Sequence, residues 1–467
     1  MLFSSITFLY YFLPLTLFVY YLVPTKAKNG ILFLASFIFY LWGEPRYSIL
    51  LLASVGIGYL GGRCIAYADK RGRNCKKVVT GCFIAVTLSI LVFFKYTDFL
   101  IGSVNKATGI TLPLSGIVLP IGISFYSFQI ISYYVDVYRG EVETEKNILH
   151  FATYVTMFPQ LIAGPIVKYH DIAQEIENRT QTVDGVMNGI RRFIAGLSKK
   201  VLISNTVGLV ADTLFAADIS GLNAAAAWIG AISYMLQIYF DFSGYSDMAI
   251  GLAEMFGFHF KENFNYPYIS GSIREFWRRW HMSLSGWFQE YLYIPLGGNR
   301  KGRVRTVINK FIVFLCTGIW HGANVTFLFW GLYHGCFLML EEFVPAIREK
   351  GGRVKSVFQH IYALLVVLIG FVFFRADTMS QGVAWVKTMF TGFDANPAAM
   401  SLALEQLTPL YFVTLAVGIV ACCPVKNLVK KSGAYEAVTS IGSLVLLALS
   451  MLSLASGTYN PFIYFRF

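Results

Sequence analysis

The sequence predicts an all-α integral membrane protein, and two of its features lead to that fold class. Of its 467 residues, 56% are hydrophobic and only 14% are charged, whereas soluble domains carry about 25% charged residues. In addition, apolar runs near the ~20 residues that a helix needs to cross a bilayer recur from one end of the sequence to the other. An ordinary soluble enzyme is therefore excluded.

The first apolar run, Phe3–Val23, contains no charged residue and none precedes it. A signal peptide begins with basic residues and ends with a small-residue cleavage site, so we expect this run to be a retained membrane helix. Further crossings are expected near Ile31–Trp42, Ser48–Ala66, Val78–Phe94, Ile117–Val137, Ala224–Phe242, Lys310–Trp320, Thr326–Leu340, Ile361–Phe374, Leu410–Cys422 and Ala437–Leu454. Several runs are short and suit re-entrant segments, so about ten to twelve crossings are predicted within one membrane domain over residues 1–467.

Clusters of basic residues predict which side of the membrane each loop faces. They are Arg63 with Lys70, Arg71, Arg73, Lys76 and Lys77; Arg300 with Lys301, Arg303 and Arg305; Arg348 with Lys350, Arg353 and Lys355; and Lys426 with Lys430 and Lys431. By the positive-inside rule these loops face the cytoplasm and both termini lie outside. The net charge of +12 then reflects topology and attraction to anionic lipid rather than nucleic-acid binding.

Several classes of chemistry have no support in the sequence. It contains no G-x-S-x-G elbow, Walker A loop, H-E-x-x-H pair or G-x-G-x-x-G loop, which argues against serine hydrolases, ATPases, zinc proteases and Rossmann enzymes. No C-x-x-C pair occurs, so we expect buried thiols without a disulfide or zinc framework. The seven cysteines are Cys64, Cys75, Cys82, Cys316, Cys336, Cys422 and Cys423.

A polar segment, "REFWRRWHMSLSGWFQEYLYIPLGGNR" at residues 274–300, interrupts this apolar chain. Placed on one helix over Ile273–Tyr291, Trp277, His281, Leu284 and Phe288 share a face. An interfacial amphipathic helix would explain the arginines and tryptophans of the segment. It does not explain the histidine, because burying an imidazole without a partner costs roughly 1–3 kcal/mol.

A second histidine, His321, lies between two apolar runs and is flanked by Gly318, Gly322 and Asn324. Small residues allow a ligand or another backbone to approach closely. Ionisable residues at membrane depth are functional candidates, although a structural histidine that donates to a carbonyl is an equal alternative. His334 follows at roughly 220° around a continuous helix, and we interpret it as structural.

Other polar residues at membrane depth are Asp136, Gln160, Asp241 and Asp247. Asp241 and Tyr245 share a helix face at i and i+4. We expect these acids to form structural pairs; the alternatives are that they orient a histidine or arginine, or that they mark a solvated cavity. Together with the two histidines they suit general acid–base chemistry, and they suit proton-coupled transport equally well.

The motifs also carry a resemblance to a known family. "FWRRWHMSLSGWFQEYLYIPLGGNR" and "GIWHGANVTFLFWGLYHG" closely resemble the membrane-bound O-acyltransferase family in its bacterial alginate O-acetyltransferase branch. "FPQLIAGPI", "YFDFSGYSDMAIGLAEMFGF", "FVFFRAD" and "NPFIYFRF" are similar to the same branch. The core motifs fall within about residues 119–345, and the resemblance covers essentially the whole chain.

The resemblance implies a ring of membrane helices that encloses a polar tunnel between the two faces of the membrane. The histidine of its W-H-G motif, here His321, would be catalytic, and that of its R-W-H motif, here His281, would lie near the acyl donor. The charged segment would then form the cytoplasmic floor of the tunnel. The residues expected to bind substrates are Trp277, Arg278 and Trp280 around the donor entrance, with Asn324 and Asp241.

The function that follows is an O-acetyltransferase of the bacterial cytoplasmic membrane, acting towards an extracytoplasmic polysaccharide. His321 would be the general base on the acceptor hydroxyl, and His281 or Asn324 would donate a hydrogen bond to the thioester carbonyl. We expect no permanently bound cofactor and no metal, with acetyl-CoA or a carrier thioester as donor. In this branch a separate extracytoplasmic partner usually completes the transfer. The alternatives are transfer of D-alanine to teichoic acid and a non-catalytic polysaccharide transporter.

Overall fold

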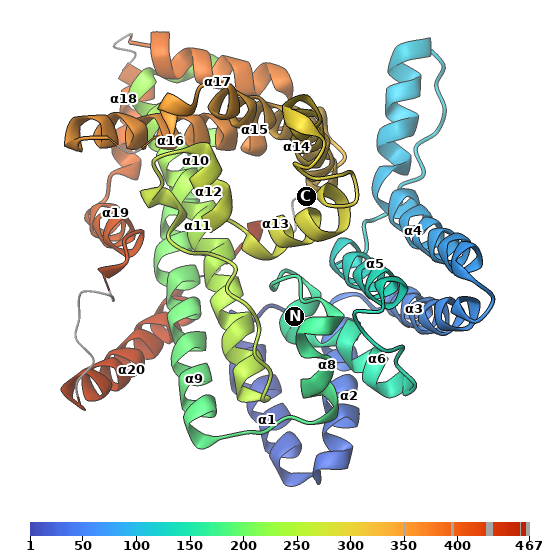
Figure 1. Ribbon diagram of the computed structural model, residues 1–467. Coiled ribbons are helices and arrows are strands. Elements are labelled where there is room, and N and C mark those ends of the chain that lie inside the picture. The colour runs from blue at the N-terminus through green and yellow to red at the C-terminus, as the bar shows by residue number, and fades with distance from the viewer. Residues whose placement is uncertain (350, 394–396, 426–432, 458, 464–467) are drawn as a thin grey trace. The chain divides into compact units, whose positions relative to one another are not determined.

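The computed structural model describes residues 1–349, 351–393, 397–425, 433–457 and 459–463 (Figure 1). The chain divides into two compact units, one formed by Met1–Phe193 with Asp247–Lys261 and the other by Ile194–Ser246 with Glu262–Phe467. Of the basic residues assigned to loops, Lys350, Lys426, Lys430 and Lys431 lie outside the described residues. The single membrane domain, the ring and the tunnel stay predictions.

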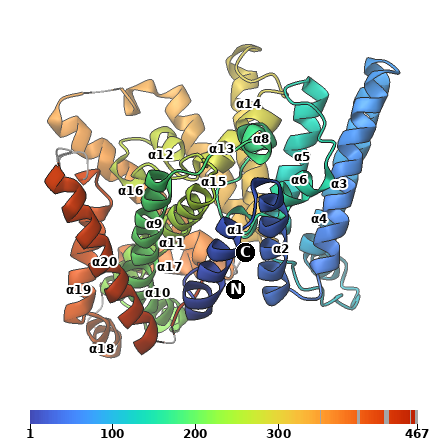
Figure 2. The same cartoon turned by 90° about the horizontal axis from the view of Figure 1, so that it is seen from below.

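The first unit is built from helices that each bury one face. In chain order they are η1 (Phe8–Phe12), α1 (Leu13–Leu22), η2 (Thr25–Ala27), α2 (Lys28–Gly43), α3 (Ser48–Asp69), α4 (Arg73–Thr108), α5 (Ile123–Arg139), α6 (Ile148–Thr156), α7 (Phe158–Leu161), α8 (Tyr169–Glu177) and α9 (Val183–Ser198), the last turns of which belong to the second unit. Helices α3 and α4 pack along each other, as Figure 2 shows.

The second unit is also helical and holds every residue that the sequence assigns to the site. Its helices are η3 (Lys199–Ser204), α10 (Asn205–Ala216), η4 (Ile219–Gly221), α11 (Ala224–Met255, shared with the first unit), η5 (Pro267–Ile269), α12 (Ile273–Arg279), α13 (Met282–Phe288), η6 (Gln289–Tyr293), α14 (Gly302–His321), α15 (Val325–Phe343), η7 (Pro345–Ile347), α16 (Arg353–Arg375), α17 (Met379–Thr391), α18 (Pro397–Gln406), α19 (Pro409–Ala421) and α20 (Gly433–Ser456). Every regular element of the described chain is a helix, which confirms the all-α class.

Several of the helices are long and apolar enough to cross a bilayer. Within the described residues, five helices have the length and the apolar composition of a membrane span: Ser48–Asp69, Arg73–Thr108, Val183–Ala216, Arg353–Arg375 and Glu436–Ser456. A sixth is added if α18 and α19, bent by 67°, form one broken span. The remaining expected crossings fall on other helices, such as α14 and α15, that do not meet these criteria. The chain is a multi-pass membrane protein.

Helices α14 and α15 form a close hairpin in the second unit, and glycine makes that approach possible. A Cβ on Gly331 would clash with the carbonyl oxygen of Phe314 and would lie 3.0 Å from Cα of Gly318. The small residues before His321 therefore serve a backbone contact, one of the two roles that the sequence allows for them.

We expect Gly331→Ala to loosen the α14–α15 hairpin, because the new methyl group meets backbone on the facing helix. The cost should be about 1–3 kcal/mol of stability, seen as a lower melting temperature in detergent. Gly335→Ala, one turn further on, is the matched control, since its Cβ would meet nothing nearer than Cβ of Phe314 at 3.4 Å. Equal melting temperatures for the two variants would contradict the tight contact.

Candidate functional site

His281 lies in a break between two short helices. The prediction of one helix over Ile273–Tyr291 is therefore wrong: α12 ends at Arg279, Trp280 is extended, and α13 begins at Met282. His281 itself has φ 43°, in the left-handed region that residues other than glycine rarely adopt. Its side chain is almost completely buried.

The break has a physical cause in Asn263, which the helical periodicity of the segment does not reveal. The backbone oxygen of Asn263 accepts from the Met282 amide at 2.8 Å, and its side-chain oxygen accepts from the Ser283 amide at 3.2 Å and the Ser283 hydroxyl at 2.9 Å. These bonds replace helical ones across the break. Tertiary hydrogen bonding therefore overrides the amphipathic pattern.

The same Asn263 oxygen fixes the tautomer of His281, whose Nδ1 lies 3.1 Å away. Because a side-chain amide oxygen only accepts hydrogen bonds, Nδ1 must carry the proton in this contact. Burial lowers the pKa of His281 to about 3, so the ring is neutral at physiological pH. Its Nε2 therefore holds a lone pair, and within the described residues no protein group bonds to this buried atom.

His321 ends α14 and is enclosed by aromatic rings. The ring centroids of Trp320, Trp330 and Phe374 lie 5.1, 5.0 and 5.2 Å from that of His321. Trp320 also lies 6.2 Å from the ring of His281. The structure thus brings both predicted histidines against one tryptophan, although 40 residues separate them in the sequence.

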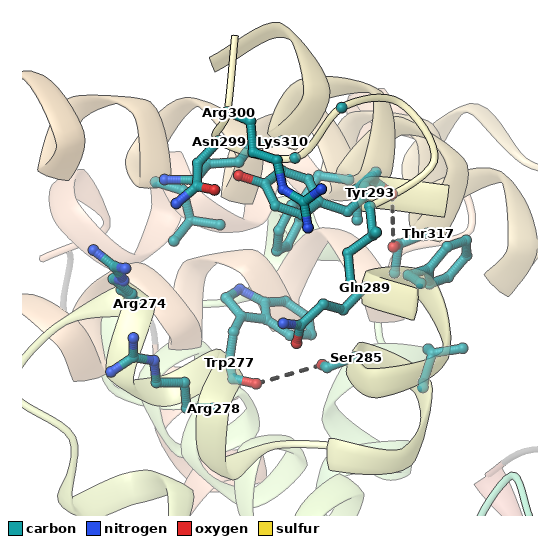
Figure 3. Close-up of a pocket in the computed structure, with 18 residues that line it drawn as sticks. Arg274, Trp277, Arg278, Ser285, Gln289, Tyr293, Asn299, Arg300, Lys310 and Thr317 are labelled. Atoms are coloured by element: carbon teal, nitrogen blue, oxygen red, sulfur yellow. Dashed lines mark hydrogen bonds between the residues drawn. The ribbon is translucent and has the colours of Figure 1, made fainter. Parts of the chain in front are cut away.

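A pocket of about 510 Å³ opens beside this aromatic layer (Figure 3). Its basic lining residues come from α12, from the segment before α14 and from α14 itself: Arg274, Arg278, Arg300 and Lys310. In Figure 3 the Trp277 side chain lies among these side chains, facing Gln289 and Tyr293. Apolar lining is supplied by Leu284, Phe288, Val313, Phe314 and Leu338.

Two residues connect the pocket to His321. Thr317 lines the pocket and lies one helical turn before His321 on α14. Trp277 also lines the pocket, and its ring lies 5.5 Å from Trp330, which in turn contacts His321. Trp277 and Trp330 therefore form a chain of aromatic contacts from the pocket to His321.

The remaining predicted site residues lie in other surroundings. Trp280 does not line the pocket and packs in the core against Phe276 and Phe371, at 5.4 and 5.2 Å. Asn324 caps α15 by accepting from the Thr326 amide, and its amide group donates to the carbonyl oxygen of Asp377 at 3.0 Å. His334 is not on a helix continuous with His321, because the chain breaks between α14 and α15.

Asp241 is held by an ion pair and by the C-terminal segment. Its carboxylate lies 2.7 Å from Nζ of Lys200, and both side chains are at most 3% exposed. The second carboxylate oxygen accepts from the Ile463 amide at 2.7 Å, and Lys200 also donates to the carbonyl oxygen of Pro461. This is the structural pairing expected for the acid, with a lysine as its partner.

A further cluster, in the first unit, has the composition of a metal site. Ligand atoms of Asp136, Glu141 and His170 lie within 4.8 Å of one another. His170, however, bridges Asp136 at 2.9 Å and Asp171 at 3.2 Å, and these hydrogen bonds raise the pKa of His170 to about 9. In this arrangement carboxylates engage both ring nitrogens of His170, which thus bridges Asp136 and Asp171.

Buried imidazoles and a basic pocket, in a chain of membrane helices, suit proton transfer and the binding of an anionic ligand at the membrane. Residues 115–376 match the membrane-bound O-acyltransferase family. The chain belongs to this family and is an acyltransferase. It is 40% identical to a probable alginate O-acetylase of Azotobacter vinelandii over 100% of both chains. It is 30% identical to the peptidoglycan O-acetyltransferase of Helicobacter pylori, over 100% of this chain and 98% of that one.

We expect Asn263→Ala to release His281, because the substitution removes the acceptor of its Nδ1–H. The loss of these buried bonds should cost about 1–3 kcal/mol of stability and should lower acyl transfer at least tenfold. Melting temperature and transfer are measured on the same detergent preparation. Asn265→Ala is the matched control, since Asn265 meets the Arg279 carbonyl oxygen through its backbone amide at 2.9 Å. Full activity in Asn263→Ala would rule out the positioning role.

Proposed function

We propose that this chain moves an acetyl group from a cytoplasmic thioester donor for the O-acetylation of an extracytoplasmic polysaccharide. The observation that carries the proposal is a basic pocket whose lining residue Trp277 contacts Trp330, which packs against the buried His321. The names of the relatives, an alginate O-acetylase and a peptidoglycan O-acetyltransferase, support acetyl as the group and a polysaccharide as the acceptor. The membrane is then the cytoplasmic membrane of a bacterium.

We propose acetyl-CoA as the donor. Coenzyme A carries a diphosphate and a ribose phosphate, and the four basic side chains of the pocket supply charge-assisted hydrogen bonds for such groups. A carrier protein presents only one phosphodiester on its prosthetic arm, which leaves most of these cations unused. The apolar lining, which includes Leu284 and Phe288, suits the pantetheine arm.

His321 is the general base in this proposal. It takes the proton from the acceptor hydroxyl as the oxygen attacks the acetyl carbonyl, and it returns the proton to the departing thiolate, so that free coenzyme A leaves as the thiol. Such proton transfer contributes about 10²–10⁴ in rate. The attacking hydroxyl belongs to a separate extracytoplasmic partner, which is acetylated in this step and then transfers the acetyl group to a hydroxyl of the polysaccharide.

His281 has a different role, because its neutral ring carries the proton on Nδ1, where Asn263 holds it. Nε2 is thus an acceptor. In this proposal it does not donate to the thioester oxyanion, although the sequence suggested that His281 could be such a donor. We propose that it accepts a hydrogen bond from a substrate group. The amide group of Asn324 carries two N–H donors and gives one of them to Asp377, so Asn324 is the residue of the two that donates to the thioester carbonyl in this proposal.

Two other functions, transfer of D-alanine and transport, are alternatives to this proposal. Transfer of D-alanine to teichoic acid is the activity named for a Bacillus subtilis relative, but that protein is 26% identical over 54% of this chain. A transporter would use the cavity without acyl chemistry. Formation of acetylated product from labelled acetyl-CoA separates both from the proposed enzyme.

His321→Gln should abolish acetylation of the polysaccharide in cells, because glutamine preserves hydrogen bonding but does not take up a proton. A loss of at least 10²-fold is expected, together with near-normal amounts of protein in the membrane. His321→Ala should behave in the same way. A purely structural histidine predicts a partly active glutamine variant and a poorly expressed alanine variant.

Arg278→Gln should raise the KM for acetyl-CoA by about five- to fiftyfold while leaving kcat within about twofold, because the lost cation acts in donor binding. The adjacent Arg279 is the control residue: it pairs with Glu275 at 2.9 Å and does not line the pocket. Arg279→Gln should therefore leave the KM nearly unchanged. Transfer that proceeds from an acetylated carrier protein but not from acetyl-CoA would contradict the choice of donor.

A further inference from the structure

The C-terminal end of α15 carries two adjacent acids that both contact α12, the helix of Arg274, Trp277 and Arg278. Glu341 is buried and accepts from the backbone amides of Ile273 at 2.6 Å and Arg274 at 3.0 Å. These are the first amides of α12, which have no partner within the helix. Glu341 therefore fixes the start of the helix that forms one wall of the pocket.

Glu342 contacts side chains instead of backbone. Its Oε2 lies 2.7 Å from Nζ of Lys310, 3.8 Å from a guanidinium nitrogen of Arg348 and 4.0 Å from one of Arg274. Lys310 and Arg274 line the pocket, whereas Glu342 does not. One carboxylate oxygen thus lies among three cations, two of which face the pocket.

This arrangement has the geometry of a replaceable counter-ion. Only the distance to Lys310 is that of a direct hydrogen bond. Arg274, the most distant of the three cations, has a side chain that is 41% exposed. Partly exposed ion pairs of this kind contribute little to stability, so their cations can turn to another anion at small cost. A phosphate group offers more oxygens than the single Oε2 and a higher negative charge.

We infer that Glu342 is a positioning residue that occupies the phosphate-binding cations in the donor-free state and is displaced from them when the donor binds. The inference rests on the proposed acetyl-CoA donor. It adds a residue outside the pocket that sets the affinity of the pocket for that donor. Glu342 holds Lys310 and Arg274 near the mouth of the pocket and competes with the phosphate for them. It thereby weakens the binding of both the donor and the coenzyme A product.

The experiment measures binding of coenzyme A itself by calorimetry, on the full-length chain in detergent at two salt concentrations. Glu342→Gln keeps the size and the hydrogen-bonding oxygen but removes the charge that competes with phosphate. The dissociation constant of coenzyme A should fall by about three- to tenfold at low salt, and the difference should shrink at high salt. The KM for acetyl-CoA should fall in parallel, and kcat should not rise.

Two matched variants separate this effect from general changes in charge or folding. Glu349→Gln removes the same charge from an exposed residue seven positions along the chain and should leave the binding of coenzyme A unchanged. Glu341→Gln should lower the melting temperature, because it weakens the hydrogen bonds that Glu341 accepts from the first amides of α12. A Glu342→Gln variant that behaves like Glu341→Gln, with lower stability and no tighter binding, would overturn the inference.

The outcomes also distinguish this inference from the donor assignment. Wild-type protein that does not bind coenzyme A at all overturns both. Wild-type protein that binds it, with a Glu342→Gln variant of equal or weaker affinity, leaves acetyl-CoA as the donor and overturns the role of Glu342. Tighter binding by Glu342→Gln that high salt abolishes supports both.

Discussion

The hydrogen bonds of Asn263 are the interaction on which the geometry of the site depends. One side-chain oxygen accepts from Ser283 and from Nδ1 of His281, and the backbone of the same residue pairs with Met282. These bonds hold His281 in a left-handed conformation that an isolated chain avoids. They also decide which ring nitrogen carries the proton, and therefore whether His281 donates or accepts.

Elsewhere in the second unit, two buried charges form an ion pair. Lys200 and Asp241 pair with each other and with the backbone at Pro461 and Ile463. Removing one partner of such a pair leaves an uncompensated charge at a cost of about 3–5 kcal/mol. Nε2 of His281 differs, because the described protein supplies no partner for it.

The sequence predicts the class of the fold and the identity of both histidines because composition and short motifs carry those signals. It does not predict the break at His281, since Trp277, Leu284 and Phe288 follow helical spacing on both sides of it. The cause lies in Asn263, eighteen residues earlier and without a periodic pattern of its own. Likewise, nothing in the spacing of Glu341 indicates that it binds the start of α12 across 68 residues. Long-range hydrogen bonds of this kind are visible only in three dimensions.

Helix α15 connects these observations, because its two ends act on different parts of one site. Near its start, Trp330 packs against His321, and the same ring lies against Trp277 of the pocket wall. At its other end, Glu341 binds the first amides of α12, and Glu342 lies among the cations of the pocket. The wall residue and the histidine are thus both positioned by one helix. One helix thus contacts both the buried histidine and the wall of the pocket.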